Sequence, residues 1–159
     1  MLKKIISYLL IILLLVYSTL IASAETIPEV SAQCAILINA DNFKTLYAKN
    51  ENERRPMAST TKIMTALITL EKAAVNNKIV NITDEMVRVE GSSMGLKPGD
   101  KVTLKSLAEG MLSVSGNDAA NSAAISIAGS IPKFAELMNK RAAELNLTNT
   151  HFVTPSGLD

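Results

Sequence analysis

The stretch of residues 56–70 constrains the fold of this chain more than any other. It reads Pro-Met-Ala-Ser-Thr-Thr-Lys-Ile-Met-Thr-Ala-Leu-Ile-Thr-Leu, and apolar residues cover most of its helical circumference. A helix that is apolar nearly all round is usually buried in a protein interior. We therefore predict a buried helix from about Ser59 to Ala74. Ile63, Leu67, Leu70 and Ala74 fall at helical spacing, and Met64, Ala66 and Ile68 widen the apolar face.

Ser59 and Lys62 stand three residues apart at the start of this helix. Residues at that spacing share a helix face, with Cβ atoms about 5–6 Å apart. A serine hydroxyl becomes a nucleophile when a base takes its proton, and burial lowers the pKa of a lysine toward the neutral amine that can be that base. We hypothesise a nucleophile at Ser59 activated by Lys62. The alternative is that Ser59 only caps the helix while Lys62 is solvated.

The Ser-x-x-Lys spacing is weak evidence alone, because about one is expected by chance in a chain of this length. A second one occurs at Ser130 and Lys133. There Pro132 follows within the first turn, which favours a helix start with Ser130 as N-cap. The choice between the two interpretations of Ser59 therefore depends on other residues.

Composition excludes several kinds of site. Among 159 residues, His151 is the only histidine and Cys34 the only cysteine, which excludes a histidine-based zinc site and an intramolecular disulfide and leaves His151 as the sole histidine for a serine–histidine triad. A formal net charge of +1 gives no reason to expect nucleic-acid binding. We expect no metal and no cofactor, and the scarcity of histidine favours lysine as the base.

Residues 1–24 have the pattern of a secretory signal peptide. Lys3 and Lys4 precede an apolar run over residues 5–21, and Ala-Ser-Ala at residues 22–24 offers a cleavage site. The pattern predicts export, with residues 25–159 as the mature chain. The alternative is an uncleaved membrane anchor, because about 17 apolar residues lie at the short edge of spanning length.

The mature chain alternates short strands, a glycine-rich loop and helices. Residues 34–39 and 44–48 predict a β-hairpin with turn chemistry at Asp41 and Asn42, and residues 79–82 predict a short extended segment. Residues 91–99 form a loop without the pattern of a phosphate site. Helices are expected from Thr103 as N-cap, from Asn117 or Asp118 to Gly129, and from Ser130 to about Asn146.

A second motif, Ser115-Gly-Asn117, lies at the predicted junction between two helices. A chain break at Gly116 can direct two polar side chains into a cleft. The alternative is a simple helix cap followed by an acidic first turn at Asp118. The motif gains weight because it follows Ser59-x-x-Lys62 in an alanine-rich segment.

Taken in order, these segments resemble the serine D-alanyl-D-alanine carboxypeptidases, the low-molecular-mass penicillin-binding proteins. This family shares Ser-x-x-Lys, Ser-x-Asn and Lys-Thr-Gly motifs with the serine β-lactamases. The resemblance covers nearly the whole mature chain. The matching segments are residues 35–38, 46–50, 56–65, 93–100, 115–120 and 149–159.

The resemblance implies a role for each site residue. Ser59 would attack the penultimate D-alanine of a peptidoglycan stem peptide ending in D-Ala-D-Ala, and Lys62 would take its proton. Ser115 would pass a proton to the leaving amine. Asn117 would bind the substrate's amide and help to hold Lys62. The Ser59 N–H would supply part of an oxyanion hole, and β-lactam antibiotics would acylate Ser59 covalently.

The resemblance also implies an α/β (α+β) fold of the β-lactamase/transpeptidase type, a helical cluster packed on an antiparallel sheet. Lys-Thr-Gly does not occur in the sequence. We therefore expect residues 25–159 to be the N-terminal portion of the catalytic domain, with an incomplete sheet, and to be inactive alone. A C-terminal membrane anchor in the missing part is compatible with this family, which acts in the cell wall or on the outer face of the membrane.

Three alternatives remain open at this point. A class A β-lactamase would carry a glutamate where Ala142 stands and Ser-Asp-Asn in place of Ser-Gly-Asn, so the carboxypeptidase is favoured. A D,D-endopeptidase of the same superfamily would have the same motifs. A non-catalytic cell-wall or penicillin-binding protein would keep the fold without the third motif.

Overall fold

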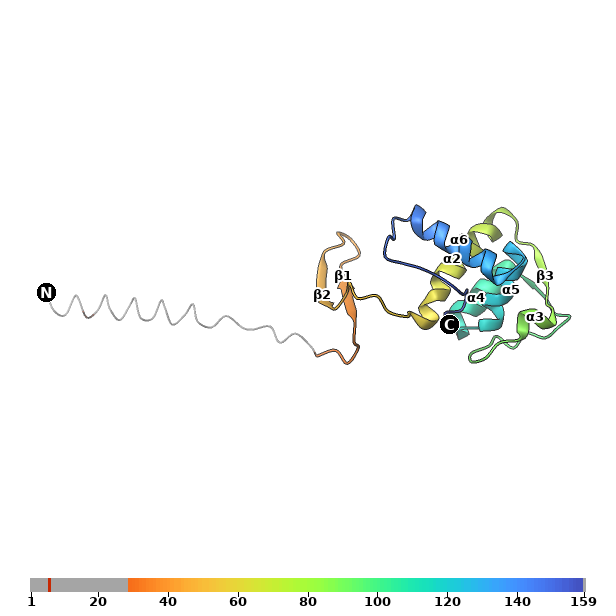
Figure 1. Ribbon diagram of the computed structural model, residues 1–159, viewed down its shortest axis with the longest axis horizontal. Helices are drawn as coiled ribbons and strands as arrows, with labels where there is room; N and C mark the ends of the chain where they lie inside the picture. The colour runs from red at the N-terminus through yellow and green to blue at the C-terminus, as the bar shows by residue number, and fades with distance from the viewer. Residues whose placement is uncertain (1–5, 7–28, 159) are drawn as a thin grey trace. The chain divides into compact units, whose positions relative to one another are not determined.

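The computed structural model describes Ile6 and residues 29–158 (Figure 1). The chain divides into two compact units, one ending at Glu53 and the other beginning at Arg54. Apart from Ile6, the predicted signal peptide at residues 1–24 lies outside the described residues. Within the described residues, no helix has the length and apolar character needed to cross a membrane.

The described part of the first unit is a β-hairpin. Strand β1, Ala35–Ile38, pairs antiparallel with β2, Thr45–Lys49, as the sequence predicts. Asn39 holds the turn, because its Oδ1 accepts hydrogen bonds from the N–H groups two and three residues later. The Asn42 Oδ1 accepts from the N–H two residues on. The turn therefore uses the side chains of Asn39 and Asn42, whereas Asp41 contributes its backbone N–H.

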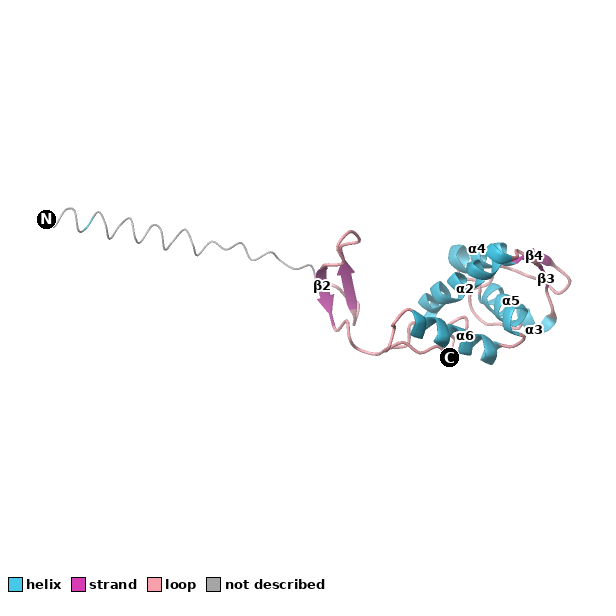
Figure 2. Ribbon diagram, turned by 90° about the horizontal axis from the view of Figure 1, so that it is seen from above, coloured by secondary structure: helices cyan, strands magenta, loops and turns pink. Residues whose placement is uncertain are grey.

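The second unit consists of four longer helices and a short antiparallel ribbon (Figure 2). Strands β3 and β4 pair antiparallel in that ribbon. The elements, in chain order, are a 3₁₀ turn η1 (Ala58–Thr60), α2 (Thr61–Val75), β3 (Ile79–Asn81), α3 (Asp84–Val87), β4 (Lys101–Thr103), α4 (Leu104–Val114), α5 (Asn117–Ala128) and α6 (Ile131–Glu144).

Side-chain caps set two of the helix starts where the sequence places them. The Thr103 Oγ1 accepts a hydrogen bond from the Ser106 N–H at 3.1 Å and begins α4. The Ser130 Oγ accepts from the Lys133 N–H at 3.4 Å and begins α6. Such caps satisfy N–H groups that have no partner inside the helix. The second Ser-x-x-Lys is therefore a helix start, as predicted.

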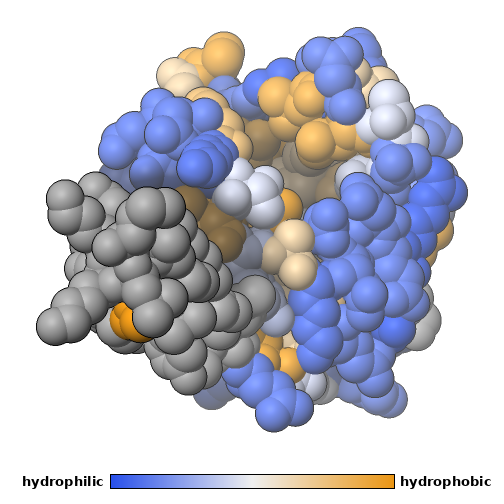
Figure 3. Space-filling view, turned by 90° about the vertical axis from the view of Figure 1, so that its left-hand side faces the viewer, coloured by the Kyte–Doolittle hydropathy of each residue, from blue (hydrophilic) through white to orange (hydrophobic). Residues whose placement is uncertain are grey.

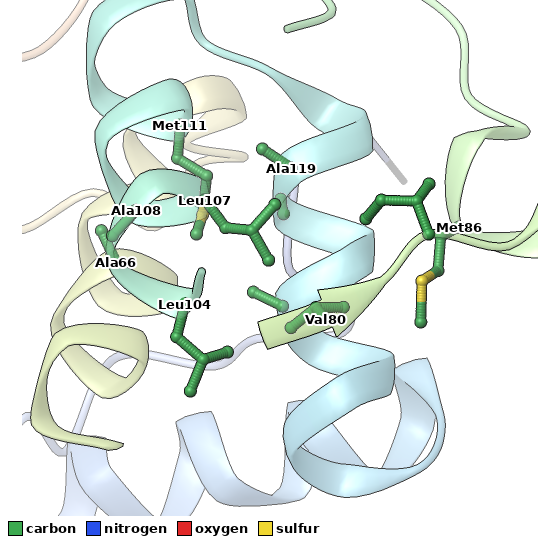
Figure 4. Packing of buried hydrophobic residues seen from close by; sticks show 11 residues of the cluster. Ala66, Val80, Met86, Leu104, Leu107, Ala108, Met111 and Ala119 are labelled. Carbon is green, nitrogen blue, oxygen red and sulfur yellow. The ribbon is translucent and has the colours of Figure 1, made fainter. Parts of the chain in front are cut away.

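The core lies where α2, α4, α5 and the short ribbon meet, and Figure 4 shows part of it. The alanines of α5 allow close approach: Ala119, Ala120 and Ala123 are 0% exposed. The larger side chains of this cluster are Val80, Ile82, Met86, Leu104, Leu107 and Met111. A second cluster joins α2 and α5 to α6 through Met64, Ile68, Ala124, Phe134, Met138, Ala142 and Phe152.

The prediction that α2 is buried nearly all round is wrong. Ile63 is 65% exposed, and Leu67 and Leu70 are also exposed, so the helix is buried on one side only in the described structure. The buried side carries Lys62, Met64, Thr65, Ala66, Ile68 and Thr69. Threonines are tolerated there because their hydroxyls are bonded: the Thr69 Oγ1 donates to the Thr65 carbonyl at 2.7 Å.

Apolar side chains also reach the surface elsewhere in the described residues. Val75, Ile79 and Leu112 are each more than half exposed. Figure 3 shows hydrophobic residues among the hydrophilic ones on the face that it draws. The helices and small antiparallel sheets together make the chain an α+β protein, as the sequence predicts.

Candidate active site

Ser59 lies in η1, directly before α2, and its side chain does not cap the helix. The N-cap position of α2 is Thr60, which makes no side-chain capping bond to that helix in the described structure. The Ser59 hydroxyl is instead hydrogen-bonded to Lys62 and Ser115. The capping alternative for Ser59 is therefore wrong, and the hydroxyl belongs to a polar cluster at the helix start.

Lys62 is buried, with 2% of its surface exposed. Its Nζ lies 3.2 Å from the Ser59 Oγ and donates a hydrogen bond to the Ser156 carbonyl at 3.0 Å. Burial lowers the pKa of Lys62 below its ordinary value of 10.5, because an ammonium loses hydration in the interior. The solvated lysine of the capping alternative is thus also ruled out. The lowered pKa makes the neutral amine easier to form.

The segment of residues 154–158 returns to the start of α2 and places the Ser156 carbonyl on Lys62 (Figure 1). The Thr65 Oγ1 donates to the Pro155 carbonyl at 2.7 Å. Gly157 has φ +77°, and a Cβ there would collide with the Ala58 carbonyl oxygen. The role of Ser156 could not be predicted from the sequence, because every residue type has a backbone carbonyl.

Ser115 enters the site from the junction of α4 and α5. It has φ +57°, in the left-handed region, and ends α4 as its C-cap. Its Oγ donates a hydrogen bond to the Ser59 Oγ at 3.0 Å. Left-handed backbone is unusual for a serine and often marks a functional position. With Lys62 neutral, hydrogen bonds run without a break from Ser115 through Ser59 to Lys62 and Ser156.

Asn117 begins α5 and is 3% exposed. Its Nδ2 donates to the Glu90 carbonyl at 2.7 Å, and its backbone N–H donates to the Ser92 carbonyl at 2.8 Å. Its Oδ1 is buried and has no hydrogen-bond partner among the described residues. The bond from Asn117 to Lys62 that the resemblance implies is therefore not present. A buried acceptor without a donor fits a ligand N–H, because leaving it unpaired costs free energy.

The cluster has the parts needed for nucleophilic catalysis: a hydroxyl, a buried amine beside it and a second hydroxyl that can pass on a proton. The described residues contain no group of three or more histidine, cysteine, aspartate and glutamate side chains that could hold a metal ion.

Known proteins similar to this chain are D-alanyl-D-alanine carboxypeptidases and related penicillin-binding proteins. The family model of peptidase S11, D-alanyl-D-alanine carboxypeptidase, matches residues 21–159. The chain belongs to this family. Among curated members, D-alanyl-D-alanine carboxypeptidase DacF of Bacillus subtilis is 42% identical over 132 residues, which cover 80% of this chain and 34% of DacF. DacB2 of Mycobacterium tuberculosis is 39% identical over 139 residues, covering 87% of this chain and 47% of DacB2.

Solved structures of this carboxypeptidase family share the fold. The D-alanyl-D-alanine carboxypeptidase from M. tuberculosis H37Rv superposes with a TM-score of 0.79 at 37% identity, covering 87% of this chain and 52% of that one. A mutant of the Streptomyces K15 DD-transpeptidase gives 0.78 at 33% identity, with 84% and 55% covered. The transpeptidase-like fold class is thus confirmed. The chain spans about a third to a half of the length of the curated relatives named above.

Proposed function

We propose that the protein is a serine-type D-Ala-D-Ala carboxypeptidase that removes the terminal D-alanine from peptidoglycan stem peptides. One observation carries the proposal: the Ser59 Oγ lies within hydrogen-bond distance of both the buried Lys62 Nζ and the Ser115 Oγ. Membership of the peptidase S11 family supports the substrate class. Ser59, Lys62 and Ser115 are the proposed catalytic residues, and Asn117 the proposed substrate-binding residue.

Acylation begins when neutral Lys62 takes the Ser59 proton and the Ser59 oxygen attacks the carbonyl of the penultimate D-alanine. The carbonyl oxygen becomes an oxyanion, which the Ser59 N–H at the start of α2 stabilises. Ser115 gives its hydroxyl proton to the nitrogen of the leaving D-alanine as the C–N bond breaks. Ser115 then regains a proton from the Lys62 ammonium, which leaves Lys62 neutral and an ester on Ser59.

Deacylation uses the same groups in the reverse order. Water enters where D-alanine has left, and its oxygen attacks the ester. Neutral Lys62 accepts the proton of the water by way of the Ser115 hydroxyl. The Ser59 oxygen then leaves and recovers a proton. A serine nucleophile with one amine base can thus complete both half-reactions without a histidine.

Asn117 orients the substrate in this proposal. Its unpaired Oδ1 accepts a hydrogen bond from an amide N–H of the stem peptide, and its Nδ2 stays fixed on the Glu90 carbonyl. A substrate that satisfies a buried acceptor is favoured over one that leaves it unpaired. β-Lactam antibiotics offer the same carbonyl to Ser59 and form a covalent ester with it.

The Lys-Thr-Gly motif is absent from this sequence. In the family it supplies carboxylate-binding groups and a further oxyanion donor, so we propose that residues 1–159 alone do not turn over substrate. Activity is therefore assigned to the product of the complete reading frame that contains this chain, called the complete product below. If that frame stops at residue 159, a chimera carrying the remaining C-terminal part of DacF serves as the complete product.

We propose that the protein works outside the cytoplasm, in the cell wall or on the outer face of the membrane. The support is the Lys-Lys, apolar and Ala-Ser-Ala sequence of residues 1–24 together with a family that processes peptidoglycan. Its partners would be stem peptides and β-lactams, with no role for nucleic acid. Membrane attachment would come from a C-terminal anchor, or from residues 5–21 if they stay uncleaved.

The test is release of D-alanine from a synthetic peptide ending in D-Ala-D-Ala. The complete product should release it, and Ser59→Ala should abolish release. Ser130→Ala is the matched control, because it removes the serine of the other Ser-x-x-Lys and should leave activity intact. Absence of D-alanine release and of fluorescent-penicillin labelling in the complete product would sink the proposal in favour of a non-catalytic binding protein.

Two further substrates separate the enzymatic alternatives. A D,D-endopeptidase would cleave a cross-linked dimer of stem peptides faster than the monomer. A β-lactamase would release hydrolysed penicillin repeatedly from Ser59, whereas a carboxypeptidase should hold the penicilloyl ester for many times longer than its peptide ester. Fast penicillin turnover without D-alanine release would contradict the assignment.

A further inference from the structure

Asp118 is a buried carboxylate that the proposed mechanism does not use. It is 1% exposed and stands directly after Asn117 in the first turn of α5. Its two oxygens accept four hydrogen bonds: from the Ser93 Oγ at 2.7 Å, the Met94 N–H at 2.8 Å, and the Leu96 and Ala119 N–H groups at 2.9 Å each. Three of these donors belong to the loop between α3 and β4.

The same loop holds Asn117 from the other direction. The Glu90 carbonyl accepts from the Asn117 Nδ2, and the Ser92 carbonyl accepts from the Asn117 backbone N–H. Residues 90–96 therefore give donors to Asp118 and acceptors to Asn117. Each of these five hydrogen bonds fixes the first turn of α5 relative to the loop. They thereby also fix the Asn117 side chain, whose Oδ1 remains unpaired.

The packing of residues 90–96 against the start of α5 also leaves little room at the turn that carries Ser115. A Cβ on Gly116 would lie 3.1 Å from the Met94 backbone nitrogen and 3.0 Å from the Asp118 Oδ1. The loop therefore packs directly against the residue that links Ser115 to Asn117. A shift of the loop away from Asp118 would release the backbone on which the left-handed Ser115 depends.

We propose that Asp118 is a positioning residue, which holds Ser115 and Asn117 toward Ser59 by binding the loop of residues 90–96. The proposal rests on the proposed function, because it assigns Ser115 and Asn117 their work. Burial alone would raise the pKa of Asp118, but its hydrogen bonds from Met94, Leu96, Ser93 and Ala119 outweigh burial and lower it. The acceptor is thus a carboxylate, which makes stronger hydrogen bonds than a neutral group.

Asp118→Asn in the complete product tests this with almost no change in shape. The amide replaces one carboxylate oxygen by a donor, so Leu96 or Met94 loses its acceptor. The matched control is Asp100→Asn: the exposed Asp100 Oδ2 accepts from the Lys97 N–H at 2.8 Å later in the same loop, and nothing joins it to Asn117 in the described residues.

Penicillin labelling is measured well below each variant's melting temperature and separated into a binding constant and an acylation rate constant. Asp118→Asn should lower the acylation rate constant about tenfold to a hundredfold, as expected for misplaced catalytic groups. Asp100→Asn should stay within about twofold of the wild type on the same scale. Amide hydrogen exchange should speed up together at Met94, Leu96 and Asn117 in Asp118→Asn but not in Asp100→Asn.

Ser93→Ala tests the positioning role if Asp118→Asn does not fold. It removes the Ser93 hydroxyl that donates to Asp118 and keeps the charge of the Asp118 carboxylate. It should lower the acylation rate constant and loosen the Asn117 amide. Normal acylation by folded Asp118→Asn or Ser93→Ala, with only a lower melting temperature, would overturn the positioning role. That result would leave the proposed function unaffected. A wild type in which penicillin never labels Ser59 would instead contradict the proposed function itself.

Discussion

At the scale of single residues, burial decides what Ser59 and Lys62 do. Two Ser-x-x-Lys pairs occur in the sequence, and the structure confirms that they differ. Ser130 caps α6, and Lys133 is exposed. Lys62 is buried against Ser59 and the Ser156 carbonyl. The same spacing thus gives a helix start in one place and a candidate nucleophile with its base in the other.

Replacing Lys62 by arginine should abolish acylation, although the positive charge remains. A guanidinium stays protonated at any usable pH and cannot take the Ser59 proton. We expect penicillin labelling of the Lys62→Arg complete product to fall about a thousandfold or more, at the upper end for loss of a general base. Lys133→Arg is the control and should label like the wild type. Rapid labelling of Lys62→Arg would refute the role of this amine.

The acylation rate should rise with pH through the lowered pKa of Lys62. Below that pKa the group is an ammonium and cannot accept a proton, and above it the amine is free to act. Burial places this transition below the ordinary 10.5. The measurement is the acylation rate constant between neutral and alkaline pH. A rate that is flat with pH, or falls as pH rises, would mean that another group limits the reaction.

The four candidate residues Ser59, Lys62, Ser115 and Asn117 could be selected from the sequence, because each belongs to a short motif of polar side chains, and their roles stay a prediction. Their supports could not. Ser156 acts through its backbone carbonyl, which any residue provides. Asp118 and its loop act through hydrogen bonds between segments far apart in the chain. Such contacts are set by the tertiary fold and leave no local pattern.

At the scale of elements, helix starts were more predictable than helix faces. Thr103 and Ser130 cap α4 and α6 as expected, because capping depends on adjacent residues. The four-residue α3 and the three-residue β4 were not predicted, since such short segments have no periodicity to detect. The packing face of α2 was misjudged because its buried side is rich in threonine, whose bonded hydroxyls the apolar pattern does not reveal.

Gly157, in the segment that supports Lys62, should tolerate alanine less well than Gly129 does. Alanine there faces left-handed strain and a collision with the Ala58 carbonyl, together about 2–5 kcal/mol of lost stability. Gly129→Ala has a similar φ but open space, so it should lose only about 1–2 kcal/mol. Urea unfolding of both variants checks this. Equal losses would show that the contact with Ala58 does not matter.

At the scale of the whole molecule, stability of the helical unit depends on the cluster between α2, α4 and α5. Leu107 in α4 is 0% exposed, whereas Leu112 on the same helix is 58% exposed. Leu107→Ala should lose about 2–5 kcal/mol of unfolding free energy through lost burial and a cavity. Leu112→Ala should change it by less than about 1 kcal/mol. Similar losses in both, measured by urea unfolding, would contradict the packing described for α4.

The arrangement as a whole brings three distant parts of the chain to one hydroxyl. The start of α2 supplies Ser59 and Lys62, the α4–α5 junction supplies Ser115, and residues 154–158 supply the carbonyl that holds the lysine. Because the two serines lie within hydrogen-bond distance, a covalent label could in principle attach to either. Which one it reaches is therefore the most direct question about this site.

That question is answered by tryptic digestion and mass spectrometry of the complete product after brief exposure to penicillin. Trypsin cuts after Lys62, so Ser59 and Ser115 fall in different peptides. The account predicts one penicilloyl group, on the peptide that carries Ser59, and none after Ser59→Ala. A label on the Ser115 peptide, or a label that survives Ser59→Ala, would contradict it.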